Sequence, residues 1–155
     1  EAESFDVITS FEVIEHINNP LEELSYFHQI LRPGGLLYIT TPNFNSLLRY
    51  YLKAEYNVIV YPEHLSYYTP KTLDFLLKKS GFEKVKLETT GISLTRFKRS
   101  KKISDEQLIS KSSSDEKLRQ SFESSKSMNM AKNIANWGLT AIGKGDSLKA
   151  LYRKK

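Results

Sequence analysis

One stretch of sequence decides the fold: FDVITS (5–10), NPLEELSYFHQIL (19–31), RPGG (32–35) and LLYITT (36–41). Its first and last runs are short and apolar, which is typical of buried strands, and the last is apolar enough to be covered on both faces. Between them, Asn19 can cap a helix that has Pro20 at its first position and Glu22 in a capping box. The stretch therefore predicts a strand, a helix that ends at RPGG, and a second strand.

The rest of the chain continues the alternation of helices and strands. The predicted elements are a short helix at 46–53, a helix from Thr69-Pro70 to Ser80-Gly81, and strands at 82–89 and 147–152. The strand at 82–89 alternates apolar and polar residues, so we expect it near a sheet edge with one wet face. This order favours a parallel, doubly wound α/β sheet, and the half-polar final pair indicates an antiparallel hairpin at one side.

Between these last two strands lies a segment of different composition. Residues 96–127 are rich in Ser, Lys and Glu and predict an exposed helix or a mobile loop, with a capping box from Ser104 to Gln107. Met130, Ile134, Trp137 and Ala141 then form one stripe of a further helix. We expect Trp137 to pack in the core or under a lid.

Composition excludes several classes of protein. The 155 residues are 39% hydrophobic and 26% charged, a globular composition, and contain no cysteine. Disulfide frameworks, thiolate zinc sites and cysteine nucleophiles are therefore excluded. No apolar run is long enough to span a bilayer and no signal segment opens the chain, which fits a cytoplasmic protein.

Charge is unevenly distributed along the chain. Residues 1–95 carry a net charge of −4 and residues 96–155 a net charge of +9. A basic segment can bind an acidic partner, RNA or a membrane surface, or it can be a solvated, lysine-rich surface. The charge therefore supports one alternative function, a non-catalytic binding module that uses its basic C-terminal third. No DNA partner is expected.

The carboxyl ends of the first two strands are the expected ligand-binding edge of the sheet. The loop after the first strand carries Glu12, Glu15 and His16, which share one face if the loop is helical. They can bind a divalent cation, or His16 can act as a general base, or the loop is a solvated helix start. His64 stands in a tyrosine-rich loop that either forms a substrate pocket or covers the sheet edge.

The seven glycines cannot form a G-x-G-x-x-G turn or a P-loop after a strand, and no nucleophile-elbow serine is present. If a nucleotide-like cofactor binds, its main cradle therefore lies outside this chain.

Four segments in order resemble class I S-adenosylmethionine-dependent methyltransferases, in particular the type 11, 12 and 23 groups. FDVITSFEVIEHINNP (5–20) resembles their fourth strand and the following loop, and LRPGGLLYITTPN (31–43) resembles their fifth strand. PEHLSYYTP (62–70) continues the match, and GDSLKALY (145–152) resembles the closing strand. The resemblance implies a Rossmann-like sheet of order 3-2-1-4-5-7-6, of which strands four to seven are present and the seventh is antiparallel.

This implies the C-terminal, acceptor-facing half of a methyltransferase, without the glycine-rich loop that holds the cofactor. The implied division is an α/β part at 1–95, a helical, basic insertion or lid at 96–144, and a closing strand of the same domain at 145–155. The first strand would then have an unpaired edge, through which a homo-oligomer can form.

The resemblance also implies roles for individual residues. Beside the methionine part of S-adenosylmethionine it places Ser10, Phe11 and Glu12; at the acceptor it places Asn43, His64, Tyr67 and Tyr68. His16 and Glu12 would be catalytic. We expect methyl transfer to an oxygen of a small-molecule, glycan or lipid-precursor acceptor.

The run EVIEH (12–16) resembles the E-x-x-E-H motif of ubiquinone-type catechol O-methyltransferases and of small-RNA 2′-O-methyltransferases. In the RNA enzymes the motif binds a divalent metal, but Ile17 stands where they carry another histidine. The implied metal ligands are Glu12, Glu15, His16 and His64, with magnesium as one such metal.

Overall fold

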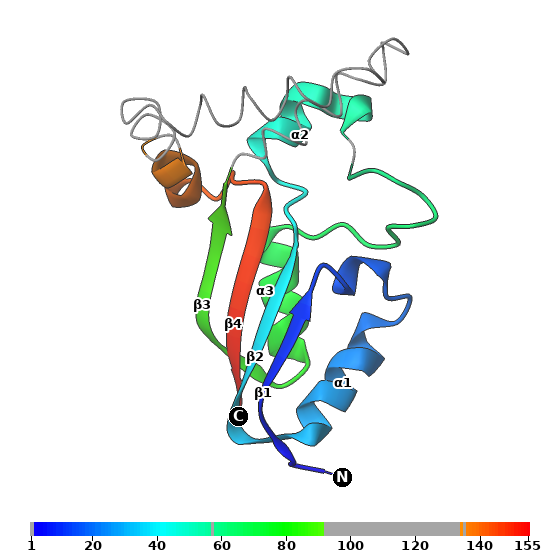
Figure 1. The fold of residues 1–155 in the computed structure, drawn as a ribbon, viewed down its shortest axis with the longest axis vertical. Helices are drawn as coiled ribbons and strands as arrows, with labels where there is room; N and C mark the ends of the chain where they lie inside the picture. Colours follow the sequence, from blue (N-terminus) through cyan, green and yellow to red (C-terminus); the bar gives the residue numbers. More distant parts are fainter. Residues whose placement is uncertain (1, 57, 92–133, 135) are drawn as a thin grey trace, which may run out of the picture.

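The computed structural model describes residues 2–56, 58–91, 134 and 136–155 (Figure 1). Its strands are β1 (Phe5–Phe11), β2 (Leu31–Pro42), β3 (Phe82–Thr90) and β4 (Ser147–Lys154). Its α-helices are α1 (Pro20–Ile30), α2 (Leu47–Leu52) and α3 (Pro70–Lys79), and residues 136–141 are also helical. Two short 3₁₀ turns complete the order, η1 (Ile14–His16) and η2 (Lys53–Glu55).

The four strands form one sheet in the order β1-β2-β4-β3 (Figure 1). β1 and β2 are parallel, whereas β4 is antiparallel to both of its neighbours. The order agrees with strands four, five, seven and six of the resembled family, and β3 lies at an edge as its alternating pattern predicts. β3 and β4 form the antiparallel pair at one side of the sheet that the sequence indicates, and β4 is the inner strand of this pair, next to β2.

Two details of α1 differ from the prediction. The Asn19 side chain forms no capping hydrogen bond with the backbone, so the expected capping box is absent, and its Nδ2 donates to Glu22 Oε2 at 3.0 Å. The helix ends at Ile30, and Leu31 already pairs with Phe5 as the first residue of β2. The RPGG run therefore lies inside the strand, as an irregularity that Gly34 accommodates with a φ of 77°.

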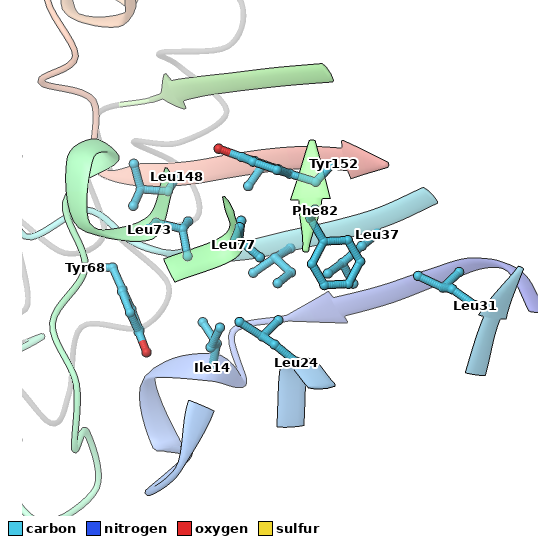
Figure 2. Close-up of a cluster of buried hydrophobic side chains, with 12 residues drawn as sticks. Ile14, Leu24, Leu31, Leu37, Tyr68, Leu73, Leu77, Phe82, Leu148 and Tyr152 are labelled. Carbon is cyan, nitrogen blue, oxygen red and sulfur yellow. The ribbon is translucent and has the colours of Figure 1, made fainter. Parts of the chain in front are cut away.

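The hydrophobic core lies between one face of the sheet and the helices α1 and α3 (Figure 2). Leu24 of α1 and Leu73 and Leu77 of α3 are fully buried against inward-facing residues of the strands. Those strand residues are Leu37, Ile39, Phe82, Leu148, Ala150 and Tyr152.

The opposite face of the sheet is open among the described residues. Val7 and Phe11 of β1 are 54% and 57% exposed, and every second residue of β2 from Leu36 to Thr40 is only half-buried. The expectation that the second strand is covered on both faces is therefore wrong for this part of the chain.

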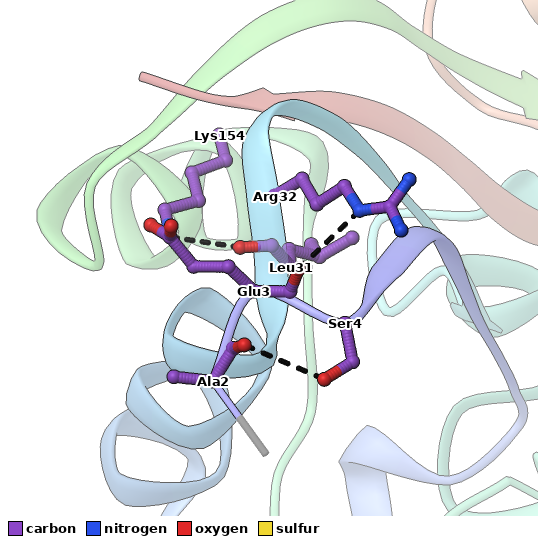
Figure 3. A network of polar contacts seen from close by, with 6 residues as sticks. All are labelled: Ala2, Glu3, Ser4, Leu31, Arg32 and Lys154. Atoms are coloured by element: carbon purple, nitrogen blue, oxygen red, sulfur yellow. Dashed lines mark hydrogen bonds and ion pairs between the residues drawn. The ribbon is translucent and has the colours of Figure 1, made fainter.

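A polar network joins the end of β4 and the start of β2 to the residues that precede β1 (Figure 3). The buried Lys154 Nζ donates to the Leu31 carbonyl oxygen at 2.8 Å and to Glu3 Oε1 at 3.3 Å. Arg32 Nε donates to the Glu3 carbonyl at 3.3 Å. These contacts fix the last residues of β4 beside the start of β2.

Most of the predicted segment 96–144 lies outside the described residues, including Ser104, Gln107 and Met130. In the part that is described, Trp137 is 75% exposed and Leu139 is the buried helical residue. The prediction that Trp137 packs in the core or under a lid is therefore wrong. Among residues placed in the structure, no helix is long and apolar enough to cross a membrane.

Candidate active site at the carboxyl ends of two parallel strands

The chain turns sharply where β1 ends. The amide of Glu12 donates to the Thr40 carbonyl oxygen at 2.9 Å, and Glu12 has a φ of 52°, which is uncommon for a residue with a Cβ. η1 follows, and the buried Ile14 anchors it in the core. The predicted helical face is thus a single 3₁₀ turn that carries Glu15 and His16 and leaves Glu12 before it.

Glu15 is the buried centre of the site. Its side chain is only 2% exposed, and Glu15 Oε2 accepts a hydrogen bond from Thr41 Oγ1 at 2.9 Å. The Glu15 carbonyl accepts from the amides of Leu65 and Ser66 at 2.8 and 3.0 Å. The Thr41 hydroxyl thus offsets part of the cost of burying the carboxylate and joins η1 to the end of β2, while the Glu15 carbonyl joins η1 to the segment before α3.

The two histidines of the site are held by backbone carbonyls. His16 Nδ1 lies 2.6 Å from the Glu63 carbonyl oxygen, and His64 Nδ1 lies 2.7 Å from that of Val58. A carbonyl oxygen only accepts, so Nδ1 carries a proton in both rings, and in a neutral ring the lone pair is then on Nε2. The rings meet edge to face with centroids 4.7 Å apart.

Glu15, His16 and His64 each offer a ligand atom, and these atoms lie within 4.8 Å of one another. Two imidazole nitrogens and one carboxylate oxygen suit zinc, manganese or iron(II) better than magnesium, which prefers oxygen ligands. The carbonyl partners of the rings and Thr41 on the carboxylate are the supporting contacts that metal ligands ordinarily have. The three residues therefore fit a divalent cation. Glu12, the fourth predicted ligand, lies outside this cluster.

Tyr68 lies under the site with an unpaired hydroxyl. The residue is 7% exposed, and its hydroxyl has no hydrogen-bond partner among the residues the structure places. Burial raises the pKa of Tyr68, and the negative charge of the Glu15 carboxylate adds to this. An unpaired buried hydroxyl costs about 1–3 kcal/mol, so a ligand group or water that pairs with it would be favoured.

The predicted cofactor-binding residues end β1. Ser10 is buried within the strand, whereas Phe11 is 57% exposed and rests edge-on against Tyr38, with ring centroids 5.8 Å apart. Glu12 is exposed at the turn. Phe11 and Glu12 are therefore accessible at the outer edge of β1, an edge that no described strand covers.

Asn43 occupies a different place from its predicted one. It is fully buried, and its Nδ2 donates to the carbonyl oxygens of Gly143 and Gly145 at 3.2 and 2.7 Å. Its Oδ1 accepts from the Asn45 amide at 3.0 Å. The geometry gives Asn43 the structural role of joining the end of β2 to the residues just before β4, and its contact with an acceptor stays a prediction.

The aromatic segment before α3 is divided between the site and the solvent. Tyr67 is half-buried, with its ring centroid 5.0 Å from that of Phe44 and 6.5 Å from that of His64. Tyr61, in contrast, is 83% exposed. Of the predicted acceptor residues, His64, Tyr67 and Tyr68 thus lie near Glu15.

The arrangement of strands defines a Rossmann-like α/β protein, and solved structures share it. A methyltransferase dependent on S-adenosylmethionine from Archaeoglobus fulgidus superposes with a TM-score of 0.56 at 18% identity, over 99% of this chain and 61% of that one. Another from Thermotoga maritima gives a TM-score of 0.51 at 26% identity, over 58% of this chain and 43% of that one. At 18% identity, the likeness to the Archaeoglobus fulgidus structure concerns the fold alone.

Sequence comparison then gives the family. Residues 1–87 match the methyltransferase domain family, and the chain belongs to this family. The resemblance seen in the sequence and the Rossmann-like sheet it implied are both confirmed.

Curated relatives include two ubiquinone biosynthesis O-methyltransferases. The one from Roseobacter denitrificans is 36% identical over 91 residues, which is 55% of this chain and 37% of that protein. The mitochondrial one from Rattus norvegicus is 37% identical over 95 residues, which is 60% of this chain and 26% of that protein. The chain thus matches well under half the length of either relative. Neither relative supports the alternative of a non-catalytic binding module.

Proposed function

We propose that this chain is the acceptor-side half of an S-adenosylmethionine-dependent O-methyltransferase that acts on a small molecule. The observation that carries the proposal is the cluster of Glu15, His16 and His64 at the carboxyl ends of β1 and β2 in a methyltransferase domain. The names of the relatives favour oxygen as the accepting atom. In this proposal residues 1–95 and 145–155 form one domain and residues 96–144 an insertion or lid.

In the proposed complex, the end of β1 forms one wall of the cofactor site. Phe11 offers an exposed apolar ring and Glu12 an exposed carboxylate there, beside the buried Ser10. S-adenosylmethionine supplies an electrophilic methyl group when bound. The contribution of these residues is to position the acceptor and the methyl donor for in-line transfer.

His16 is the proposed general base. Its Nδ1–H is held by the Glu63 carbonyl, so the Nε2 lone pair can accept the proton of an acceptor hydroxyl as the new O–CH₃ bond forms. His64, held in the same tautomer by the Val58 carbonyl, faces the same space. We assign Glu12 the weaker role of binding polar groups at the turn.

A divalent cation is the alternative use of the same residues. Held by Glu15, His16 and His64, it would supply Lewis-acid polarisation of the acceptor hydroxyl. The lone pair on His16 Nε2 cannot bind a cation and accept a proton at the same time. A chelator that removes the cation should therefore abolish activity in the metal mechanism and leave it unchanged in the general-base mechanism.

The test is methyl transfer by the full-length protein from labelled S-adenosylmethionine to a small catechol. We expect His16→Gln to lower turnover by about 10²–10⁴-fold, the usual contribution of a general base, without a matching change in cofactor affinity. His28→Gln is the matched control, because His28 of α1 packs against Phe82 of β3, away from the cluster. Unchanged turnover in His16→Gln would reject His16 as the base, and loss of activity with EDTA in the wild type would favour the cation.

A further inference from the structure

A second cluster of polar and charged groups lies beside the candidate site, on and around α2. Arg49 of α2 stacks on two rings, with its Cζ 4.3 Å from the centroid of Phe44 and 4.9 Å from that of Tyr50. The amide of Arg49 donates to Ser46 Oγ at 3.1 Å, which caps the helix. Within the described part of the chain, the half-buried guanidinium forms no hydrogen bond or ion pair. Its N–H groups therefore remain available in a fixed orientation.

Lys144 brings a second positive charge to the same ring. Its Nζ lies 4.3 Å from the Tyr50 centroid and donates to Asn45 Oδ1 at 2.7 Å. The Tyr50 hydroxyl donates to the same oxygen at 3.1 Å. The two cations are thus held around one tyrosine by neutral groups, and among the described residues neither has a carboxylate partner.

Lys144 lines an apolar cavity of about 520 Å³, and Arg49 stacks on Tyr50, which also lines it. The cavity lies between α2 and the helical residues 136–141, and its lining is formed by Leu47, Leu48, Tyr50, Tyr51, Leu139, Lys144 and Asp146. The Asp146 side chain is buried and has its own interactions. A volume of this size with few polar groups is typical of sites for small organic ligands.

Ring contacts connect the cavity to the candidate active site. Phe44 lies under the Arg49 guanidinium, and its ring centroid is 5.0 Å from that of Tyr67. Tyr67 in turn contacts His64, with centroids 6.5 Å apart. Arg49, Phe44 and Tyr67 therefore form a line of contacts between the wall of the cavity and His64.

We propose that this cavity is a binding subsite for a ligand with an apolar body and one carboxylate or phosphate group. The apolar walls would take the body, and Arg49 and Lys144 would bind the anionic group through charge-assisted hydrogen bonds. That the ligand is the methyl acceptor rests on the proposed function. The subsite would then select acceptors that carry a negative charge apart from the reacting hydroxyl.

A pair of fluorescent dyes tests the subsite without any turnover. 1-Anilinonaphthalene-8-sulfonate has an aromatic body with an anionic group, and N-phenyl-1-naphthylamine has the same ring system without the charge. We measure the dissociation constants of both dyes and take their ratio, so that a change in the cavity itself cancels. The ratio is the dissociation constant of the anionic dye divided by that of the neutral dye. We expect Arg49→Met and Lys144→Met each to raise this ratio about tenfold, the usual effect of losing a charge-assisted hydrogen bond.

Two control variants make the result specific. Lys53→Met removes one exposed positive charge just after α2 and should leave the ratio unchanged. Leu139→Trp should fill the cavity and weaken both dyes. The proposal is overturned if Arg49→Met and Lys144→Met change the ratio no more than Lys53→Met does, or if both dyes bind Leu139→Trp as well as the wild type.

These outcomes are independent of methyl transfer. A protein that shows the expected dye ratios but no methyl transfer would keep the subsite and lose the proposed function. A protein that transfers methyl groups with unchanged dye ratios would keep the function and lose the subsite.

Discussion

The core behind the sheet and the polar cluster in front of its carboxyl ends are held together in different ways. The core is made of leucines on α1 and α3 that pack on a sheet face, and apolar burial stabilises it without directional contacts. The cluster depends on individual hydrogen bonds between residues far apart in sequence, such as His16 with Glu63 and Thr41 with Glu15. The two regions should therefore respond differently to substitution, the core in folding stability and the cluster in ligand affinity.

The largest effect on stability is expected in the core. Leu77 is fully buried on α3, and Leu77→Ala should lower the free energy of unfolding by about 2–5 kcal/mol, because it removes buried methyl groups and leaves a cavity. Urea denaturation measures this change. Phe75→Ala on the same helix is the control, since Phe75 is 67% exposed and its loss should change stability by less than about 0.5 kcal/mol. Equal losses from both variants would mean that α3 does not pack as described.

In the polar cluster, we expect substitution to change metal affinity rather than folding stability. Thr41→Val removes the hydroxyl that donates to Glu15 Oε2 and should weaken binding of zinc or manganese about 10–100-fold, the usual effect of losing a contact that orients a metal ligand. Isothermal titration calorimetry with the metal alone measures this. Thr41→Ser keeps the hydroxyl, and Thr40→Val changes the neighbouring threonine on the other face of β2.

Both control variants should bind metal as the wild type does. If Thr41→Val binds metal with unchanged affinity, Thr41 does not orient Glu15 as a ligand. If the wild type binds neither zinc nor manganese, the metal mechanism fails and His16 remains the candidate base.

The same contrast explains what the sequence could predict. The stripe of Leu73, Leu76 and Leu77 has helical spacing and predicts a buried face. The structure places Leu73 and Leu77 in the core, with Leu76 partly buried against it. The spacing of Glu12, Glu15 and His16 predicts one helical face. Because the chain turns at Glu12 with a positive φ and continues as a 3₁₀ turn, only the latter two join the cluster.

Other features of the site could not be predicted from the amino-acid sequence. The carbonyl groups of Glu63 and Val58 select the histidine tautomers, and every residue has a carbonyl, so no residue type marks these contacts. Asn43 was predicted from the resemblance as an acceptor residue, but its place at the end of β2 beside the start of β4 makes it a structural link. The exposure of Trp137 likewise shows that an aromatic residue at helical spacing is not by itself a core residue.

The smallest expected effect lies at the border of the core, where a histidine packs among apolar groups. His28 of α1 packs edge-on against Phe82, with ring centroids 5.3 Å apart. Burial lowers the pKa of His28, and the positive charge of Lys154 lowers it further. The unfolded chain therefore binds a proton more readily than the folded chain does between the folded pKa and the ordinary value of about 6.5.

His28 should consequently stabilise the fold fully above about pH 6.5, and this contribution should be lost as the pH falls through the folded pKa. Urea denaturation between pH 5 and 8 measures the slope of stability with pH. His28→Gln should reduce that slope, because it removes the ring whose pKa burial lowers. An identical slope in the wild type and His28→Gln would show that the folded chain holds the charged and neutral rings equally well.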